Sequence, residues 1–186
     1  MMSNLPNSLT WLRVALVPLL VVTWYWGGES TRWPAVLVFA LAGFTDWLDG
    51  WLARRLAQTS PFGAFLDPLA DKLLVLSALV LVVDRYGGPW LTLPTVLIVT
   101  REIAVGGVRE WAARRGVSGS VPVSWLGKLK TMSQMLALLL LLGGGEVAGV
   151  NLLDLGIGLL VIAAALSLWS LLEYLKLARR LIAEAA

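Results

Sequence analysis

Four aspartates in the first half of the chain have the type and spacing of metal ligands. Asp46 and Asp49 are three residues apart. Asp67 and Asp71 are four apart, so each pair shares one face if its segment is helical. Carboxylates are hard oxygen ligands that suit Mg²⁺ or Mn²⁺, and two helices with two carboxylates each can hold two ions close together. The pattern therefore predicts a site for Mg²⁺ or Mn²⁺, with two ions expected.

Small residues and an arginine accompany these aspartates. Gly50 and Ala53 lie on the helical face of Asp46, and Arg54 follows directly after Ala53. Small side chains let a large ligand approach the backbone, and an arginine adds charge-assisted hydrogen bonds to a phosphate. Such residues are more often packing contacts in membrane helices, but their fixed offsets from the carboxylates favour a phosphate-bearing ligand. The alternative is that Arg54 and Lys72 only neutralise the carboxylates by ion pairing.

The composition indicates a membrane protein. Of the 186 residues, 58% are hydrophobic and 15% are charged, against roughly 45–50% and 25% in soluble domains. The sequence contains no His and no Cys, which excludes a thiolate nucleophile, a disulfide, a histidine base and a zinc site with the usual ligands. The net charge of +3 does not indicate nucleic-acid binding, because the basic residues flank apolar segments as they do in membrane proteins.

Six apolar segments approach the roughly 20 residues that a membrane-spanning helix needs. They cover about residues 10–26, 33–56, 62–83, 90–113, 125–147 and 152–175. Together they predict an all-α integral membrane protein with a single domain over residues 1–186. Nothing basic precedes the first segment, so we expect a retained span and not a signal peptide. Residues 5–8 are expected to form a separate short helix at the membrane surface.

The basic residues predict the orientation of these spans. If the amino terminus is cytoplasmic, the outer loops hold only Arg32 and Arg85, and the other 13 of the 15 Lys and Arg residues lie on the cytoplasmic half. An excess of positive charge on the cytoplasmic side is the usual arrangement. We therefore expect both termini and the aspartates to lie toward the cytoplasm.

Basic residues inside the fourth and fifth segments indicate an anionic second ligand. They are Arg101, Arg109, Lys128 and Lys130. Arg101 and Arg109 are eight residues apart, about two helical turns, and therefore share one face of the fourth segment. Charges inside membrane segments need partners, and Glu102 and Glu110 are one set of possible partners. The other interpretation is a pocket in which the basic side chains bind the phosphate of an anionic acceptor.

The aspartates and small residues together resemble the signature of a known family, the CDP-alcohol phosphotransferases. The chain reads Asp46-x-x-Asp49-Gly50-x-x-Ala53-Arg54, eight residues, then Gly63-x-x-x-Asp67-x-x-x-Asp71, and matches the signature at every position. The resemblance implies a six-helix membrane enzyme, commonly a homodimer. Such an enzyme binds a CDP-linked alcohol through divalent metals and transfers its phosphoryl-alcohol part to an acceptor hydroxyl, releasing CMP.

The resemblance also implies a role for each residue of the signature. Metal ligation is assigned to Asp46, Asp49, Asp67 and Asp71, and Asp71 is also the expected general base. The cytidine diphosphate is expected to be held by Gly50, Ala53, Arg54 and Gly63, with Asn7 as a further donor-binding candidate. Asn7 lies beside Pro6 and is equally explained as a residue that starts a helix.

The rest of the chain resembles the bacterial branch of the family that uses CDP-diacylglycerol as donor and sn-glycerol 3-phosphate as acceptor. The matching segments are residues 4–13, 45–50, 62–68, 100–102 and 125–131. The resemblance implies transfer of the phosphatidyl group in a bacterial cytoplasmic membrane, among membrane lipids and without nucleic acid. The acceptor-phosphate candidates are Thr10, Arg101, Arg109, Lys128 and Lys130.

Three other functions remain open. An enzyme that uses another phosphorylated alcohol, such as inositol phosphate, would carry out the same chemistry. A divalent-cation channel or transporter would use the aspartates as a permeation site, but it leaves Gly50, Ala53 and Arg54 unexplained. A structural subunit would need the carboxylates only for ion pairs.

Overall fold

The computed structural model describes residues 5–27, 32–56, 61–114 and 125–184. Within these ranges the description leaves out the side chains of residues 5–10, 47, 49–56, 61–68, 71, 109, 112–114, 125, 126, 128 and 177–184. The described residues form α1 (Leu5–Trp26), α2 (Trp33–Leu56), α3 (Pro61–Tyr86), α4 (Pro89–Arg114), α5 (Trp125–Gly143) and α6 (Leu152–Glu184), with strands β1 (Glu146–Val147) and β2 (Val150–Asn151) between α5 and α6. The all-α prediction is therefore confirmed, with one short hairpin added.

The amino-terminal end differs from the prediction. Residues 5–8 continue into α1 and do not form a separate helix. Pro6 is compatible with this arrangement because it lies in the first turn, where a backbone N–H has no partner within the helix. The prediction of a short surface helix separate from the first span is therefore wrong.

The end of α5 also differs, because the chain turns earlier than expected. The fifth segment was predicted to run to residue 147, but α5 ends at Gly143. Gly144 and Gly145 both have positive φ angles, which glycine adopts readily and which stop a helix. In the hairpin, Glu146 pairs with Asn151 and Val147 with Val150. Its two turn residues also have positive φ, as a tight two-residue hairpin turn requires.

A side-chain cap fixes the start of α6. The Asn151 side-chain oxygen accepts hydrogen bonds from the backbone N–H of Leu153 at 3.0 Å and of Asp154 at 3.4 Å. The Asn151 side-chain amide donates to the Asp154 carboxylate at 2.8 Å. These contacts satisfy N–H groups that the first turn of a helix leaves free. From this cap, α6 continues to Glu184, beyond the predicted end at residue 175.

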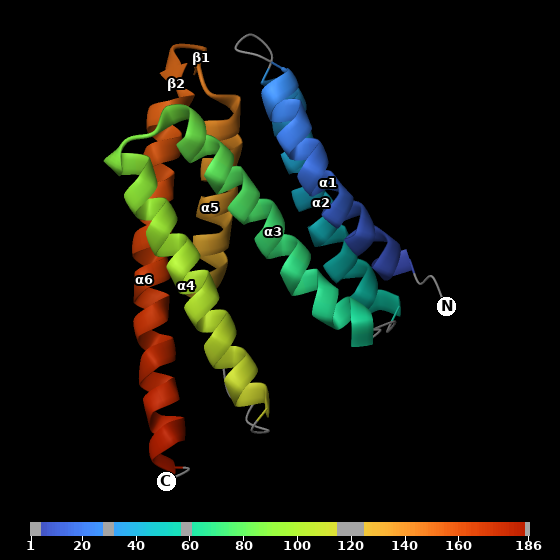
Figure 1. Ribbon diagram of the computed structural model, residues 1–186, viewed down its shortest axis with the longest axis vertical. Helices are drawn as coiled ribbons and strands as arrows, with labels where there is room; N and C mark the ends of the chain where they lie inside the picture. The colour runs from blue at the N-terminus through green and yellow to red at the C-terminus, as the bar shows by residue number, and fades with distance from the viewer. Residues whose placement is uncertain (1–4, 28–31, 57–60, 115–124, 185–186) are drawn as a thin grey trace.

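The helices pack in two groups that α3 joins (Figure 1). In one group α6 packs against α5 and α4, and in the other α1 packs against α2 and α3. Helix α3 also contacts α4 and α5, and a buried apolar cluster with members such as Phe39, Leu79, Leu138 and Leu160 runs through both groups. The first residues of α1 and α3 and the last of α2 lie at the lower end of this group of helices, and α4 and α6 extend further down in the view (Figure 1). This end therefore holds the segments that carry the aspartates.

Many large hydrophobic side chains are exposed on the outer surface of the helices. Large hydrophobic side chains such as Leu37, Val80, Ile103 and Met132 are more than 60% exposed. In the described part of the chain, two stretches are long and apolar enough to cross a membrane, Pro89–Val108 of α4 and Leu152–Lys176 of α6. The apolar stretches of α1, α2 and α5 are shorter. Contiguous exposed apolar surface on this scale is typical of contact with lipid or another protein.

The contact between α5 and α6 depends on a glycine. A Cβ atom added at Gly156 would lie 2.7 Å from Leu141 Cγ and 3.3 Å from the Ala137 carbonyl oxygen, whereas one at Gly158 would meet nothing within 4 Å. We expect Gly156→Ala to lower the free energy of unfolding by about 1–3 kcal/mol through overpacking. Gly158→Ala, the matched control, should not destabilise the protein, because alanine favours a helix over glycine. Thermal unfolding in detergent compares the two; equal melting temperatures would contradict the close packing.

Candidate active site

An ion pair between a buried arginine and a half-exposed aspartate joins α1 to α2 at the first predicted metal ligand. Arg13 Nη1 lies 3.0 Å from Asp46 Oδ1. The Arg13 side chain is almost completely buried, whereas half of the Asp46 side chain is exposed. Arg13 therefore neutralises part of the carboxylate charge while Asp46 stays accessible. The sequence could have indicated this pair, because an arginine inside an apolar helix needs a partner.

The other three aspartates are placed by their backbones. Asp49 lies in α2 with Asp46, and Asp67 and Asp71 lie in α3. Both helices are continuous over these residues and contact each other, so the intervals of three and four residues do put each pair on one helical face. Only the side chain of Asp46 is among those described. Within the described side chains, no group of three or more potential metal ligands is found.

The donor chemistry of this set fits Mg²⁺ or Mn²⁺. All four residues offer carboxylate oxygens, which these ions prefer, and the exposed part of Asp46 leaves an oxygen ligand within reach of an ion. The metal assignment itself stays a prediction. The side chains of the donor-binding candidates lie outside the described residues; these candidates are Asn7, Gly50, Ala53, Arg54 and Gly63.

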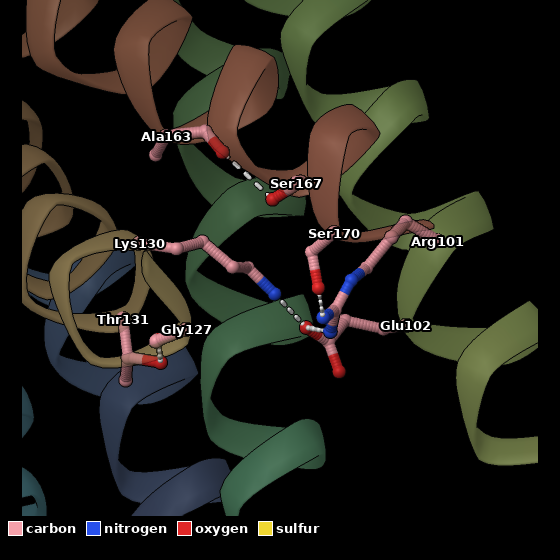
Figure 2. A network of polar contacts seen from close by, with 8 residues as sticks. All are labelled: Arg101, Glu102, Gly127, Lys130, Thr131, Ala163, Ser167 and Ser170. Atoms are coloured by element: carbon pink, nitrogen blue, oxygen red, sulfur yellow. Dashed lines mark hydrogen bonds and ion pairs between the residues drawn. The ribbon is translucent and has the colours of Figure 1, made fainter. Parts of the chain in front are cut away.

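A second cluster of charges is buried where α4, α5 and α6 meet. Figure 2 shows Arg101 and Lys130 pointing toward the Glu102 carboxylate from different helices. Arg101 Nη1 lies 3.0 Å from Glu102 Oε1, and Lys130 Nζ contacts the same oxygen. Arg101 and Lys130 are 8% and 3% exposed, so this cluster, which we call the cation cluster, lies inside the protein. The structure therefore brings together two of the predicted acceptor-phosphate residues.

Helix α6 completes the cation cluster. Arg101 Nη2 donates a hydrogen bond of 2.7 Å to Ser170 Oγ, which is also drawn in Figure 2. The Arg101 guanidinium carbon lies 5.9 Å from the centre of the Tyr174 ring, within the range of a cation–π interaction. Ser170 and Tyr174 are both buried. They were absent from the sequence prediction, although polar residues spaced three to four apart in an otherwise apolar helix are a signal for them.

Among the described side chains, the cluster combines several cations with Glu102. Glu102 neutralises part of the charge of Arg101 and Lys130, as the alternative interpretation expected. Lys72 of α3 also interacts electrostatically with Glu102, and a Cβ atom added at Gly106 of α4 would lie 2.8 Å from the Lys72 amino group. These four side chains comprise three cations and one carboxylate. Arginine and lysine side chains in such a group can donate charge-assisted hydrogen bonds to the oxygens of an anion.

The other acceptor candidates are placed only by helix register. Arg109 lies in α4 eight residues after Arg101, on the same face of a continuous helix. Lys128 lies in α5 two residues before Lys130, about 200° around the helix, so the two lysines occupy different faces. Thr10 lies in α1. The side chains of Arg109, Lys128 and Thr10 lie outside the described residues.

Comparisons with known proteins agree with the signature. Residues 3–169 match the family model for CDP-alcohol phosphatidyltransferases. The chain is 46% identical over 177 residues to the CDP-diacylglycerol-glycerol-3-phosphate 3-phosphatidyltransferase of Haemophilus influenzae, with 95% of this chain and 94% of the relative covered. Proteins of the same name from Salmonella choleraesuis and Escherichia coli K12 are 47% and 46% identical over 179 residues, with 96% of this chain and 97% of each relative covered. The similarity therefore extends over nearly the whole length of each relative.

Proposed function

Because the chain belongs to the CDP-alcohol phosphatidyltransferase family, we propose that it transfers the phosphatidyl group of CDP-diacylglycerol to sn-glycerol 3-phosphate. The products are phosphatidylglycerol phosphate and CMP. One observation carries this proposal: the identity of 46% over nearly the full length of relatives named for this reaction. The cation cluster supports the acceptor half, because a phosphorylated acceptor needs buried positive charge and a neutral one does not.

The donor site lies on α2 and α3. Asp46, Asp49, Asp67 and Asp71 would hold two Mg²⁺ or Mn²⁺ ions, and Arg13 limits the repulsion between the carboxylates by pairing with Asp46. Bound ions would stabilise the negative charge that develops on the transferred phosphate. The donor-binding residues are Asn7, Gly50, Ala53, Arg54 and Gly63, whose small members leave room for the cytidine diphosphate.

The acceptor site uses the cation cluster. Arg101 and Lys130 bind the phosphate of sn-glycerol 3-phosphate, while Thr10, Arg109 and Lys128 are further candidates from the same end of the helices. Asp71 takes the proton from the acceptor hydroxyl. The hydroxyl oxygen attacks the phosphorus that carries the diacylglycerol. The bond from this phosphorus to the CMP oxygen breaks. Lys72 follows Asp71 directly and lies beside Gly106 of α4, so α3 connects the two sites.

The protein acts within a membrane. The two long apolar stretches of α4 and α6 and the exposed apolar side chains support this setting. We extend it to six spans in the bacterial inner membrane, with both termini and the catalytic residues on the cytoplasmic side. Both substrates then reach the site, because the lipid donor enters from the bilayer and the water-soluble acceptor from the cytoplasm. A homodimer is the proposed assembly.

A direct assay tests this function. Purified protein in detergent is incubated with CDP-diacylglycerol, Mg²⁺ and labelled sn-glycerol 3-phosphate, and lipid-extractable label and CMP are measured together. We expect equal amounts of both products, and none after chelation of the metal. Inositol phosphate should not compete with the labelled acceptor. CMP without labelled lipid would assign a different acceptor, and absence of both products from folded protein would refute the proposal.

A further inference from the structure

Two side chains of α6 hold the guanidinium group of Arg101 from one side. Ser170 Oγ accepts a hydrogen bond from Nη2 at 2.7 Å, and the Tyr174 ring centre lies 5.9 Å from the guanidinium carbon. Ser170 and Tyr174 are four residues apart, so they lie one turn apart on the same face of α6. Ser170 is 4% exposed, which shields its hydrogen bond from water.

These contacts restrict the direction in which Arg101 presents its donors. An unrestrained arginine has many rotamers, and fixing one of them costs conformational entropy when a ligand binds. Here Glu102 contacts Nη1, Ser170 contacts Nη2 and the Tyr174 ring lies against the guanidinium. Among the described residues, the buried Nε atom of Arg101 has no hydrogen-bond partner. Leaving a buried N–H group unpaired costs free energy. The Nε–H group of Arg101 is therefore in place to donate a hydrogen bond to an oxygen of a bound anion.

The neighbouring Ser167 shows that Ser170 has an unusual partner. Ser167 is also buried in α6, and its hydroxyl donates to the Ala163 carbonyl oxygen of the previous turn at 2.7 Å. This is the common bond of a serine inside a helix. Ser170 instead bonds to a charged group 69 positions away in the sequence. Both serines appear in Figure 2, where only Ser170 reaches the cation cluster.

We propose that Ser170 and Tyr174 are positioning residues that hold Arg101 in the orientation needed to bind the acceptor phosphate. The inference rests on the proposed function and adds α6 to the determinants of acceptor affinity. Neither residue contacts the substrate in this mechanism. Their effect is on the orientation of Arg101, so it falls on acceptor binding more than on the transfer step.

The test compares kinetic constants of Ser170→Ala with those of the wild type. We expect the KM for sn-glycerol 3-phosphate to rise roughly tenfold, because a hydrogen bond to a charged group is lost. The KM for CDP-diacylglycerol and the kcat at saturating acceptor should change less than about twofold. Ser170→Thr keeps the hydroxyl and should restore most of the affinity. Tyr174→Leu should raise the same KM about two- to fivefold, in line with a cation–π contact.

Ser167→Ala is the matched control, since it removes a buried hydroxyl one turn away that does not contact Arg101. Its KM for the acceptor should stay at the wild-type value. The inference is overturned if Ser170→Ala leaves this KM unchanged, if Ser167→Ala raises it equally, or if Ser170→Thr fails to restore it. Failure of the proposed function gives a different result, because the wild-type protein itself would then form no lipid from sn-glycerol 3-phosphate.

Discussion

Replacement of Asp71 by asparagine is expected to lower kcat at least about a thousandfold. Asparagine has the same size but no negative charge, so it cannot accept the acceptor proton and is a weaker ligand for Mg²⁺. A positioned general base alone contributes typically 10²–10⁴ to a rate. Affinity for CDP-diacylglycerol, measured by direct binding, should fall much less than kcat. An equal loss of both would reduce Asp71 to a metal ligand only.

Asp84 provides the control for this substitution. It lies in the same helix 13 residues later, about 20 Å along α3, where it is exposed and accepts a hydrogen bond of 3.0 Å from the Tyr25 hydroxyl. Asp84→Asn should keep kcat within about twofold of the wild type. A folded Asp71→Asn protein with more than a tenth of wild-type activity would contradict the proposed role of the carboxylates.

The helices could be predicted because each is a long apolar segment between turn residues. The predicted helix ends are wrong where the local backbone conformation, and not hydropathy, determines where a helix stops. The hairpin between α5 and α6 depends on positive φ angles at Gly144, Gly145 and Ala148. Alanine rarely adopts such an angle, so the sequence contains no signal for the turn at Ala148. The extension of α6 to Glu184 lies in a polar stretch that hydropathy does not assign to a span.

The candidate site could be predicted only where residues are close in sequence. The aspartates are three or four residues apart, so the helical repeat alone relates Asp46 to Asp49 and Asp67 to Asp71. The cation cluster joins residues that are distant in sequence, since Lys130 is 28 positions from Glu102 and Ser170 is 69 from Arg101. Such contacts depend on how α4, α5 and α6 pack, and no interval in the sequence specifies this packing.

The cation cluster also explains how the two proposed sites can act together in one transfer. Glu102 by itself would satisfy one buried cation, but three cations surround it in the structure, one of them Lys72 from α3. An anion bound there would receive charge-assisted hydrogen bonds from these cations. The same helix α3 carries Asp71, the proposed base, directly before Lys72. A phosphorylated acceptor bound at the cluster would therefore lie beside the helix that removes its proton.

Arg101→Ala is expected to raise the KM for sn-glycerol 3-phosphate about 30- to 100-fold. The change removes a charge-assisted donor to phosphate, and such hydrogen bonds contribute about 1.5–3 kcal/mol each. The KM for CDP-diacylglycerol should stay within about threefold, because the proposed donor-binding residues lie on α1, α2 and α3. Arg101→Lys keeps the charge but loses the planar group that contacts both Glu102 and Ser170, so an intermediate KM is expected. Steady-state kinetics with each substrate varied in turn measures both constants.

Arg85→Ala is the control for the loss of a cationic side chain. Arg85 lies in α3 near the opposite end of the helices, over the ring of Trp24 at 5.7 Å. Its removal should leave both KM values unchanged, since both proposed sites lie at the other end of the helices. If Arg101→Ala has the wild-type KM for sn-glycerol 3-phosphate, the cation cluster does not bind the acceptor. If instead the KM values of both substrates rise equally, Arg101 stabilises the packing of the helix bundle and does not bind the acceptor specifically. A selective rise therefore separates phosphate binding from a structural ion pair.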